Sequence, residues 1–177
     1  MKKIITIGAS TSSQSINKQL AKFSGSLLNN VEVENVDLSE LADIAIYSVD
    51  KEGAGVVPEQ IVALNKLFKS VDGFIISFAE HNGSFAAGYK NIIDWISRQE
   101  GKVFNEKPVF LMATSPGGRG GATVLGAALN YYPYLGAKIT GSVSVPSFGE
   151  NYKDNRIVNE EILSNIKCEI TKFESEL

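Results

Sequence analysis

The sequence contains one cysteine and one histidine, which excludes two common kinds of structural cross-link. Cys168 cannot form a disulfide within the chain, and one histidine with one cysteine cannot build an ordinary structural zinc site. No stretch approaches the roughly 20 apolar residues that a membrane-spanning helix needs. Lys2 and Lys3 precede an apolar stretch far too short for a signal peptide. We therefore expect a cytoplasmic protein without a metal site.

Clusters of basic residues are also lacking. The chain has 17 Lys and Arg against 20 Asp and Glu, a net charge of -3. Nucleic acids and anionic membranes are bound through basic patches, so we expect neither as a partner and a small molecule instead. With 177 residues, 44% of them hydrophobic, residues 1–177 are expected to form a single domain with a full core.

Apolar runs of strand length alternate with segments of helical periodicity, which is typical of a parallel sheet covered by helices on both faces. The expected strands are Lys3 to Gly8, Val31 to Val36, Gly73 to Phe78, Pro108 to Ala113 and Ile139 to Val145. Only the second alternates cleanly, so it is the expected edge strand. Apolar stripes predict helices from Ile16 to Leu27, Ile61 to Val71, Phe85 to Ile96 and Ile162 to Leu177, with another over Ala122 to Tyr132. The pattern suits an α/β, flavodoxin-like three-layer sandwich whose five-stranded parallel sheet has the order 2-1-3-4-5.

In such a sheet, ligands bind beyond the carboxyl ends of the strands that flank the point where the strand order reverses. This rule selects three loops, Gly8 to Asn17, Ala79 to Ser84 and Thr114 to Gly121. The long connection from Asp37 to Val57 is open to two interpretations, a lid or an oligomer contact.

The first loop, Gly8 to Asn17, carries five hydroxyls and two amides between a strand and a helix start. The N–H groups and positive dipole end of a helix attract phosphate, and hydroxyls and the Asn17 amide can donate hydrogen bonds to it. The loop lacks the glycine pattern of a dinucleotide fingerprint and the Gly-Lys-Ser/Thr of a P-loop. We predict a phosphate-binding loop; simple capping of the helix by Ser or Thr is the alternative.

Four segments, in the right order, match motifs of a known family. They are this loop, the segment Ala79-Glu80-His81-Asn82-Gly83-Ser84, the helix with Lys90, Asn91, Asp94 and Trp95, and the loop Ser115-Pro116-Gly117-Gly118-Arg119-Gly120-Gly121. The chain thereby resembles the NADPH-dependent FMN reductase family. The resemblance implies FMN as cofactor and NADPH or NADH as reductant, with ping-pong hydride transfer to a quinone, flavin, azo compound or similar acceptor. It also implies a homodimer or homotetramer. A flavodoxin-type electron carrier and a non-catalytic FMN-binding module remain alternatives.

The resemblance also assigns cofactor-binding positions. They are Ser10, Ser12, Ser15, Ile16 and Asn17 in the first loop, Glu80, His81, Asn82, Gly83 and Ser84 in the second, and Ser115, Pro116, Gly117, Gly118 and Arg119 in the third. Within these groups, the resemblance implies that Ser10, Ser15 and Asn17 hold the FMN phosphate. It implies that Glu80, Asn82 and Gly83 form a wall beside the isoalloxazine ring, with Ser84 just beyond it. No side chain is assigned a catalytic role, because the flavin carries the chemistry; His81 is either a proton donor or, as we favour, a ring packed near the flavin. Arg119 would contact the 2′-phosphate of NADPH, contact the flavin edge, or remain a solvated loop charge.

Three positions depart from the family pattern. Ser12 stands where the family usually has Arg, which removes a cationic contact to the phosphate, and Lys18 is one candidate to replace it. Ala79 replaces Pro and His81 replaces Tyr, which changes the groups expected near the flavin edge.

Overall fold

Five parallel strands form the central sheet in the computed structural model, which describes residues 1–99 and 101–177. In chain order the elements are β1 (Lys2–Ala9), α1 (Ile16–Gly25), β2 (Val31–Val36), η1 (Leu38–Leu41), α2 (Val49–Gly53), α3 (Glu59–Ser70), β3 (Gly73–Phe78), β4 (Glu80–His81), β5 (Ser84–Phe85), α4 (Ala87–Ser97), β6 (Lys107–Thr114), α5 (Ala122–Tyr131), η2 (Tyr132–Leu135), β7 (Ala137–Val145), α6 (Phe148–Asn151), β8 (Tyr152–Lys153), β9 (Arg156–Ile157) and α7 (Glu160–Ser175). The sheet order β2-β1-β3-β6-β7 is the predicted 2-1-3-4-5, and every neighbouring pair is parallel. The edge position of Val31–Val36 is thus confirmed.

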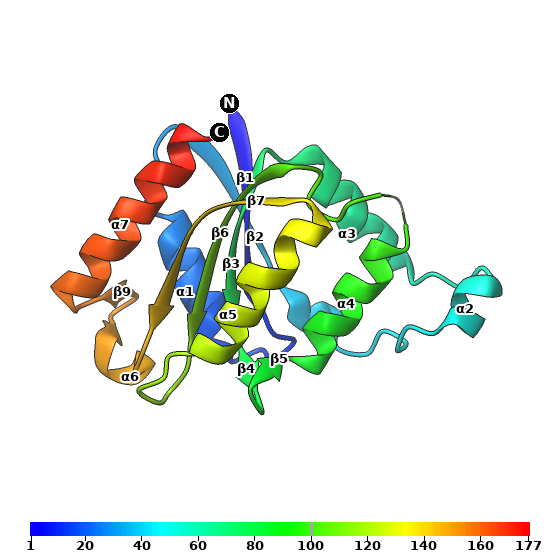
Figure 1. Ribbon diagram of the computed structural model, residues 1–177, viewed down its shortest axis with the longest axis horizontal. Coiled ribbons are helices and arrows are strands. Elements are labelled where there is room, and N and C mark those ends of the chain that lie inside the picture. The colour runs from blue at the N-terminus through cyan, green and yellow to red at the C-terminus, as the bar shows by residue number, and fades with distance from the viewer. Residues whose placement is uncertain (100) are drawn as a thin grey trace.

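Alternating side chains of β1 show how both faces of the sheet are covered. Ile4 lies in one buried cluster with residues of α1 and α7, whereas Ile5 and Ile7 lie in another with residues of α3, α4 and α5. Figure 1 shows the same division, with α3, α4 and α5 on one side of the sheet and α1 and α7 on the other. Because successive strand residues point to opposite faces, an unbroken apolar run needs helices on both sides, and the predicted three-layer sandwich is confirmed.

The face that α1 turns toward the sheet differs from the predicted apolar stripe. Its buried residues are Asn17, Leu20, Ala21, Ser24 and Gly25, while Ile16 and Phe23 are only partly buried. A Cβ on Gly25 would lie 2.6 Å from the Cγ2 atom of Thr6 in β1. Small side chains therefore let this helix lie closer to the sheet than an aliphatic stripe would allow.

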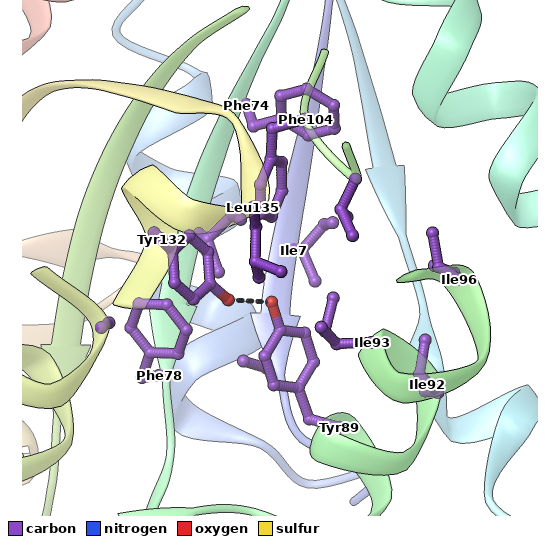
Figure 2. Packing of buried hydrophobic residues seen from close by; sticks show 14 of the residues in the cluster. Ile7, Phe74, Phe78, Tyr89, Ile92, Ile93, Ile96, Phe104, Tyr132 and Leu135 are labelled. Carbon is purple, nitrogen blue, oxygen red and sulfur yellow. Dashed lines mark hydrogen bonds between the residues drawn. The ribbon is translucent and has the colours of Figure 1, made fainter. Parts of the chain in front are cut away.

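Aromatic side chains fill the core on the α3–α5 side of the sheet. The rings of Phe104 and Tyr132 are stacked with centroids 5.0 Å apart, and Phe74 meets Phe104 edge-on at 5.1 Å. Within this cluster, the buried hydroxyls of Tyr89 and Tyr132 are hydrogen-bonded to each other (Figure 2). Each phenol thus satisfies the other where no water reaches them.

The connection between β2 and α3 projects from the body, with α2 near its tip (Figure 1). Two residues of α4 hold its base. The Trp95 Nε1 atom donates to the Ala45 carbonyl at 2.7 Å, and the Asn91 side chain accepts from the Tyr47 N–H at 2.8 Å. Ile46 is 75% exposed. The α4 segment that resembles the family motif therefore anchors a connection that presents Ile46, Val49 and Val56 to solvent.

The last helix, α7, packs its predicted stripe only in part. Ile166, Ile170 and Phe173 are buried, and Cys168 is exposed. The helix spans 16 residues. None of the helices in the described part of the chain is long and apolar enough to cross a membrane.

Candidate functional site

The three predicted ligand loops all leave the sheet at the carboxyl ends of its strands, which form one edge of the sheet. Ala9 at the end of β1 pairs in register with Phe78 at the end of β3, and Phe78 pairs with Ala113 near the end of β6. Figure 1 shows the β4–β5 hairpin and the chain before α5 at this same edge. The structure therefore places the three loops at the same end of the sheet, although they are far apart in the sequence.

The first loop is shaped by its own hydroxyls. Ser15 is the N-cap of α1 and its side chain accepts from the Lys18 N–H at 3.2 Å. The Oγ atoms of Ser10 and Ser12 accept from the N–H groups two residues further on, at 3.2 and 3.3 Å. The first-turn N–H groups of Ile16 and Asn17 have no partner inside the helix, as at every helix start. The loop therefore presents backbone donors and a positive helix end together.

Two glycines fix the position of this loop by close approach. A Cβ on Gly8 would lie 2.3 Å from the backbone nitrogen of Lys18, so α1 begins almost in contact with the end of β1. A Cβ on Gly88, in the first turn of α4, would lie 2.7 Å from the Cγ2 atom of Thr11. The loop is thus packed between α1 and the start of α4. The sequence had indicated Thr11 only as one of the five hydroxyls of the loop, and no motif had pointed to Gly88.

Asn17 lies in a different environment from the one predicted for a phosphate ligand. Its side chain is directed into the sheet, and the residue is 2% exposed. The Oδ1 atom accepts from the Ser77 hydroxyl at 2.7 Å and from the Thr114 N–H at 3.0 Å, while Nδ2 donates to the Thr114 carbonyl at 3.2 Å. Its hydrogen bonds therefore go to β3 and β6.

The second loop is a hairpin and not an irregular loop. Glu80 and His81 pair with Phe85 and Ser84 as antiparallel strands β4 and β5. Between them, Asn82 and Gly83 have φ values of 51° and 75°, which makes the two-residue turn that Asn-Gly favours. The residues from His81 to Ser84 are exposed. This turn is therefore accessible to a ligand at the same end of the sheet as the first loop.

Glu80 joins the hairpin to the third loop. Its Oε2 atom accepts from the Val124 N–H, in the first turn of α5, at 3.0 Å. The N-cap residue Gly121 provides no side chain for this purpose. A carboxylate at a helix N-terminus is favoured by the helix dipole and by the free N–H groups. Glu80 therefore holds the relative positions of two walls of the site.

The third loop combines a fixed base with an exposed rim. Gly120 and Gly121 have φ values of 57° and 73°, and a Cβ on Gly120 would lie 2.5 Å from the Ser144 Oγ atom. The carbonyls of Ser115 and Gly117 accept from the N–H groups of Phe148 and Ser147 at 3.1 and 3.0 Å. On the rim, Pro116 to Arg119 are exposed, and Arg119 donates to the Thr123 hydroxyl at 2.7 Å. Backbone groups of this loop are thus accessible from the same edge.

Comparison with known proteins agrees with this arrangement. Residues 2–150 match the family described as NADPH-dependent FMN reductase. The chain belongs to this family.

Individual relatives within and near the family are distant. A quinone reductase from Escherichia coli (strain K12) is 36% identical over 85 residues, which cover 48% of this chain and 45% of that protein. The chain thus matches about half the length of this relative. An uncharacterized protein of Mycoplasma pneumoniae is 30% identical over 146 residues, 80% of this chain and 85% of that one. The structure of FerB, a flavoenzyme NAD(P)H:(acceptor) oxidoreductase from Paracoccus denitrificans, aligns over 99% of both chains with a TM-score of 0.81 and 21% identity.

Lys18 is not directed at the first loop, although it was the candidate to replace the arginine that the family usually has at Ser12. Its Nζ atom lies 2.8 Å from the Asp37 carboxylate. Both residues line a cavity of about 620 Å³ between α1 and β2, and this cavity is lined by none of the predicted cofactor positions among the described residues. Lys18 is therefore paired with Asp37 in this cavity and not with a group of the first loop.

The Lys18–Asp37 pair makes stability depend on acid pH. The hydrogen bond from Lys18 and those from Ser39 hold the pKa of the Asp37 carboxyl at about 2, below its ordinary value near 4. A lowered pKa stabilises the folded state above the ordinary pKa, and that stabilisation is lost as the pH falls toward 2. Because both side chains are partly exposed, we expect Asp37→Asn to lower the free energy of unfolding at pH 7 by only about 0.5–1 kcal/mol.

Urea unfolding at pH 7 and at about pH 2–3, near the lowered pKa, checks this prediction. The difference in free energy of unfolding between wild type and Asp37→Asn is expected to be smaller at the acid pH. Asp43→Asn is the matched control, because Asp43 is an exposed carboxylate in the same connection. A difference that stays constant over this pH range would show that the Asp37 charge is not responsible.

Proposed function

We propose that this protein is an FMN-dependent NAD(P)H oxidoreductase that reduces a small-molecule acceptor such as a quinone, a free flavin or an azo compound. One observation carries the proposal. A hydroxyl-rich loop at the start of α1 lies at the same edge of the sheet as two loops whose tips, His81 to Ser84 and Pro116 to Arg119, are exposed. Membership of the NADPH-dependent FMN reductase family supports the same conclusion.

The residues of the first loop fit a phosphate monoester. The hydroxyls of Ser10, Ser12 and Ser15, with the N–H groups of Ile16 and Asn17, form a donor set at a helix N-terminus, where an anion is stabilised without a cationic side chain. We assign the FMN phosphate to this loop. Because Ser12 stands where the family usually has Arg, the N-terminus of α1 contributes a larger share of the affinity for the phosphate.

The flavin ring is assigned to the space bounded by the other two loops. The Asn82–Gly83 turn would form one wall, with Glu80, His81 and Ser84 beside it, and Ser115, Pro116, Gly117 and Gly118 would form the other. Bound FMN would supply hydride acceptance from a nicotinamide and its donation to the acceptor. The chain's own part is to orient the ring and to direct the backbone donors of Gly117 and Gly118 at an edge where negative charge develops.

Steady-state turnover tests the proposal. Protein loaded with FMN is expected to oxidise NADPH when menadione is supplied as acceptor. FMN binding without turnover would instead support a non-catalytic flavin module, and reduction by NADPH with transfer only to a protein acceptor would support an electron carrier. Absence of FMN binding in a fluorescence titration would refute all three.

Arg119 is proposed to contact the 2′-phosphate of NADPH. The side chain is exposed and its only recorded hydrogen bond among the described residues is to Thr123, so it can reach a ligand on the rim of the site. We expect Arg119→Ala to raise the KM for NADPH about tenfold, because a charge-assisted hydrogen bond is lost, and to leave the KM for NADH unchanged. Arg156→Ala, at an exposed position in the β8–β9 hairpin, is the control. An unchanged preference between the two nucleotides would exclude this contact.

We also propose a homodimer or homotetramer. The projecting connection presents Ile46, Val49 and Val56 to solvent, and the exposed tips of the second and third loops leave the proposed ring site open on one side. A second subunit would cover such surfaces. Light scattering measures the mass directly, and a monomer would contradict the proposal. A cytoplasmic location and the absence of nucleic-acid and membrane partners stay predictions from the sequence.

A further inference from the structure

The side chain of Asn17 imitates a neighbouring strand. Its Oδ1 atom accepts from the Thr114 N–H at 3.0 Å and its Nδ2 atom donates to the Thr114 carbonyl at 3.2 Å. These are the two hydrogen bonds that one residue of an adjacent strand would exchange with Thr114. Thr114 is the last residue of β6, so the first turn of α1 is joined to the point where the third loop begins.

The same amide is also joined to β3. The Ser77 hydroxyl donates to the Asn17 Oδ1 atom at 2.7 Å, and Ser77 is fully buried. Ser77 lies in β3 just before the β4–β5 hairpin, which is the second loop of the site. Thr114 in turn donates through Oγ1 to the Val145 carbonyl of β7 at 2.6 Å. One buried amide thus links the starts of all three loops.

We propose that Asn17 is a positioning residue for FMN binding, which fixes the phosphate loop relative to the other two loops, and that Ser77 acts through it. The inference rests on the proposed function and changes the role expected of Asn17. Its side chain faces away from the loop surface, whereas its backbone N–H belongs to the first turn of α1, where a phosphate would bind. A shift of this side chain therefore redirects the backbone donors of α1.

A role in packing alone would change stability without changing affinity, so the two must be measured separately. Ser77→Ala is the decisive variant, because a fully buried hydroxyl cannot touch FMN. If Ser77 acts through Asn17, Ser77→Ala weakens FMN binding about threefold to tenfold, the effect expected when one hydrogen bond of a buried network is lost. In the Asn17→Ala background it has no further effect, because the shared hydrogen bond is already absent.

Fluorescence titrations with FMN and with riboflavin separate the phosphate from the ring. Riboflavin lacks the phosphate, so its affinity is expected to fall less than that of FMN in both variants. Ser24→Ala is the matched control, because Ser24 is a fully buried serine on the same helix whose hydroxyl contacts Met112 at 3.3 Å, away from the loops. It is expected to leave both affinities unchanged.

Asn17→Asp makes the affinity for FMN depend on pH, which a role in packing alone would not do. The substitution keeps the shape of the side chain but replaces the Nδ2 donor with an oxygen that faces the Thr114 carbonyl. Ionised, the two oxygens repel; protonated, the carboxyl restores the donor. The dissociation constant for FMN, divided by the wild-type value at each pH, is therefore expected to fall as the pH is lowered.

The outcomes are distinct. Failure of the wild type to bind FMN refutes the proposed function, and this inference with it. If the wild type binds FMN, unchanged affinity in Ser77→Ala and Asn17→Asp refutes the positioning role alone. Weakened binding in Asn17→Ala with unchanged binding in Ser77→Ala would make Asn17 a direct phosphate ligand and overturn the proposal. If Asn17→Ala does not fold, Ser77→Ala and the pH profile of Asn17→Asp still decide.

Discussion

Gly8→Ala is expected to lower the free energy of unfolding by about 3 kcal/mol, at the upper end of the usual effect of overpacking. The added Cβ would lie 2.3 Å from the backbone nitrogen and 2.4 Å from the Cα atom of Lys18. Both are backbone atoms in the first turn of α1, so no rotation of a side chain can relieve the contact. The helix start must move away from β1.

The same displacement is expected to weaken FMN binding in whatever protein still folds. The first-turn donors of α1 and the Ser15 cap move with the helix, while the second and third loops stay attached to β3 and β6. Urea unfolding and FMN titration measure the two effects. Gly126→Ala is the control, because this glycine lies within α5 and, apart from its chain neighbours and the backbone of its own helix, none of the described residues comes within 4 Å of an added Cβ. Alanine there should be neutral or stabilising. Equal stabilities for the two variants would contradict the proposed close approach.

The strands could be predicted from the sequence because their environment is uniform. Gly73–Phe78 is buried at every position, so an apolar run of this length has one interpretation. The edge strand Val31–Val36 alternates because only part of it is covered. The alternation of such runs with helical segments then leaves few topologies, since parallel crossovers are right-handed and short.

The short hairpins were missed, although one of them carries a clear signal. Asn-Gly at Asn82 and Gly83 favours a two-residue hairpin turn, but the flanking strands have only two residues each, too few to show alternation. The β8–β9 hairpin turns at Asp154 and Asn155, both with positive φ, and its strands are equally short. A pattern of period two cannot be recognised over two residues.

The positions of the three candidate loops could be predicted from the sequence, whereas the directions of their side chains could not. Polar loops after neighbouring strands identified the edge of the sheet, which follows from topology. The direction of Asn17 depends on which face of α1 meets the sheet. That face contains Gly25, which approaches Thr6 of β1 closely, whereas Ile16 and Phe23 of the apolar stripe are only partly buried. The bond between Glu80 and Val124 joins residues 44 positions apart, so no local motif could show it.

Tyr132→Phe is expected to lower the free energy of unfolding by about 1–3 kcal/mol, because it leaves a buried donor without a partner. The hydroxyls of Tyr89 and Tyr132 are hydrogen-bonded to each other inside the aromatic cluster (Figure 2), and both residues are buried. Removing one hydroxyl leaves the other buried without a hydrogen-bond partner. Tyr89→Phe is expected to act in the same way, and the double variant should recover most of the loss because no polar group then remains unpaired.

A double-mutant cycle by urea unfolding measures this coupling. Additive losses in the double variant would show that the two hydroxyls do not depend on each other. Tyr134→Phe is the control, because Tyr134 is 81% exposed, and it should change stability little.

Alkaline pH gives an independent check of the same pair. Burial raises the pKa of both Tyr89 and Tyr132 above the ordinary value near 10. Above about pH 10 the unfolded chain ionises these phenols and the folded protein does not, so the unfolded state binds fewer protons and stability falls as the pH rises. Each buried tyrosine contributes up to about 1.4 kcal/mol of this loss per pH unit. The double phenylalanine variant lacks both groups, so its stability should decline less steeply between about pH 10 and pH 11 than that of the wild type. Parallel declines would mean that neither phenol has a raised pKa in the folded protein.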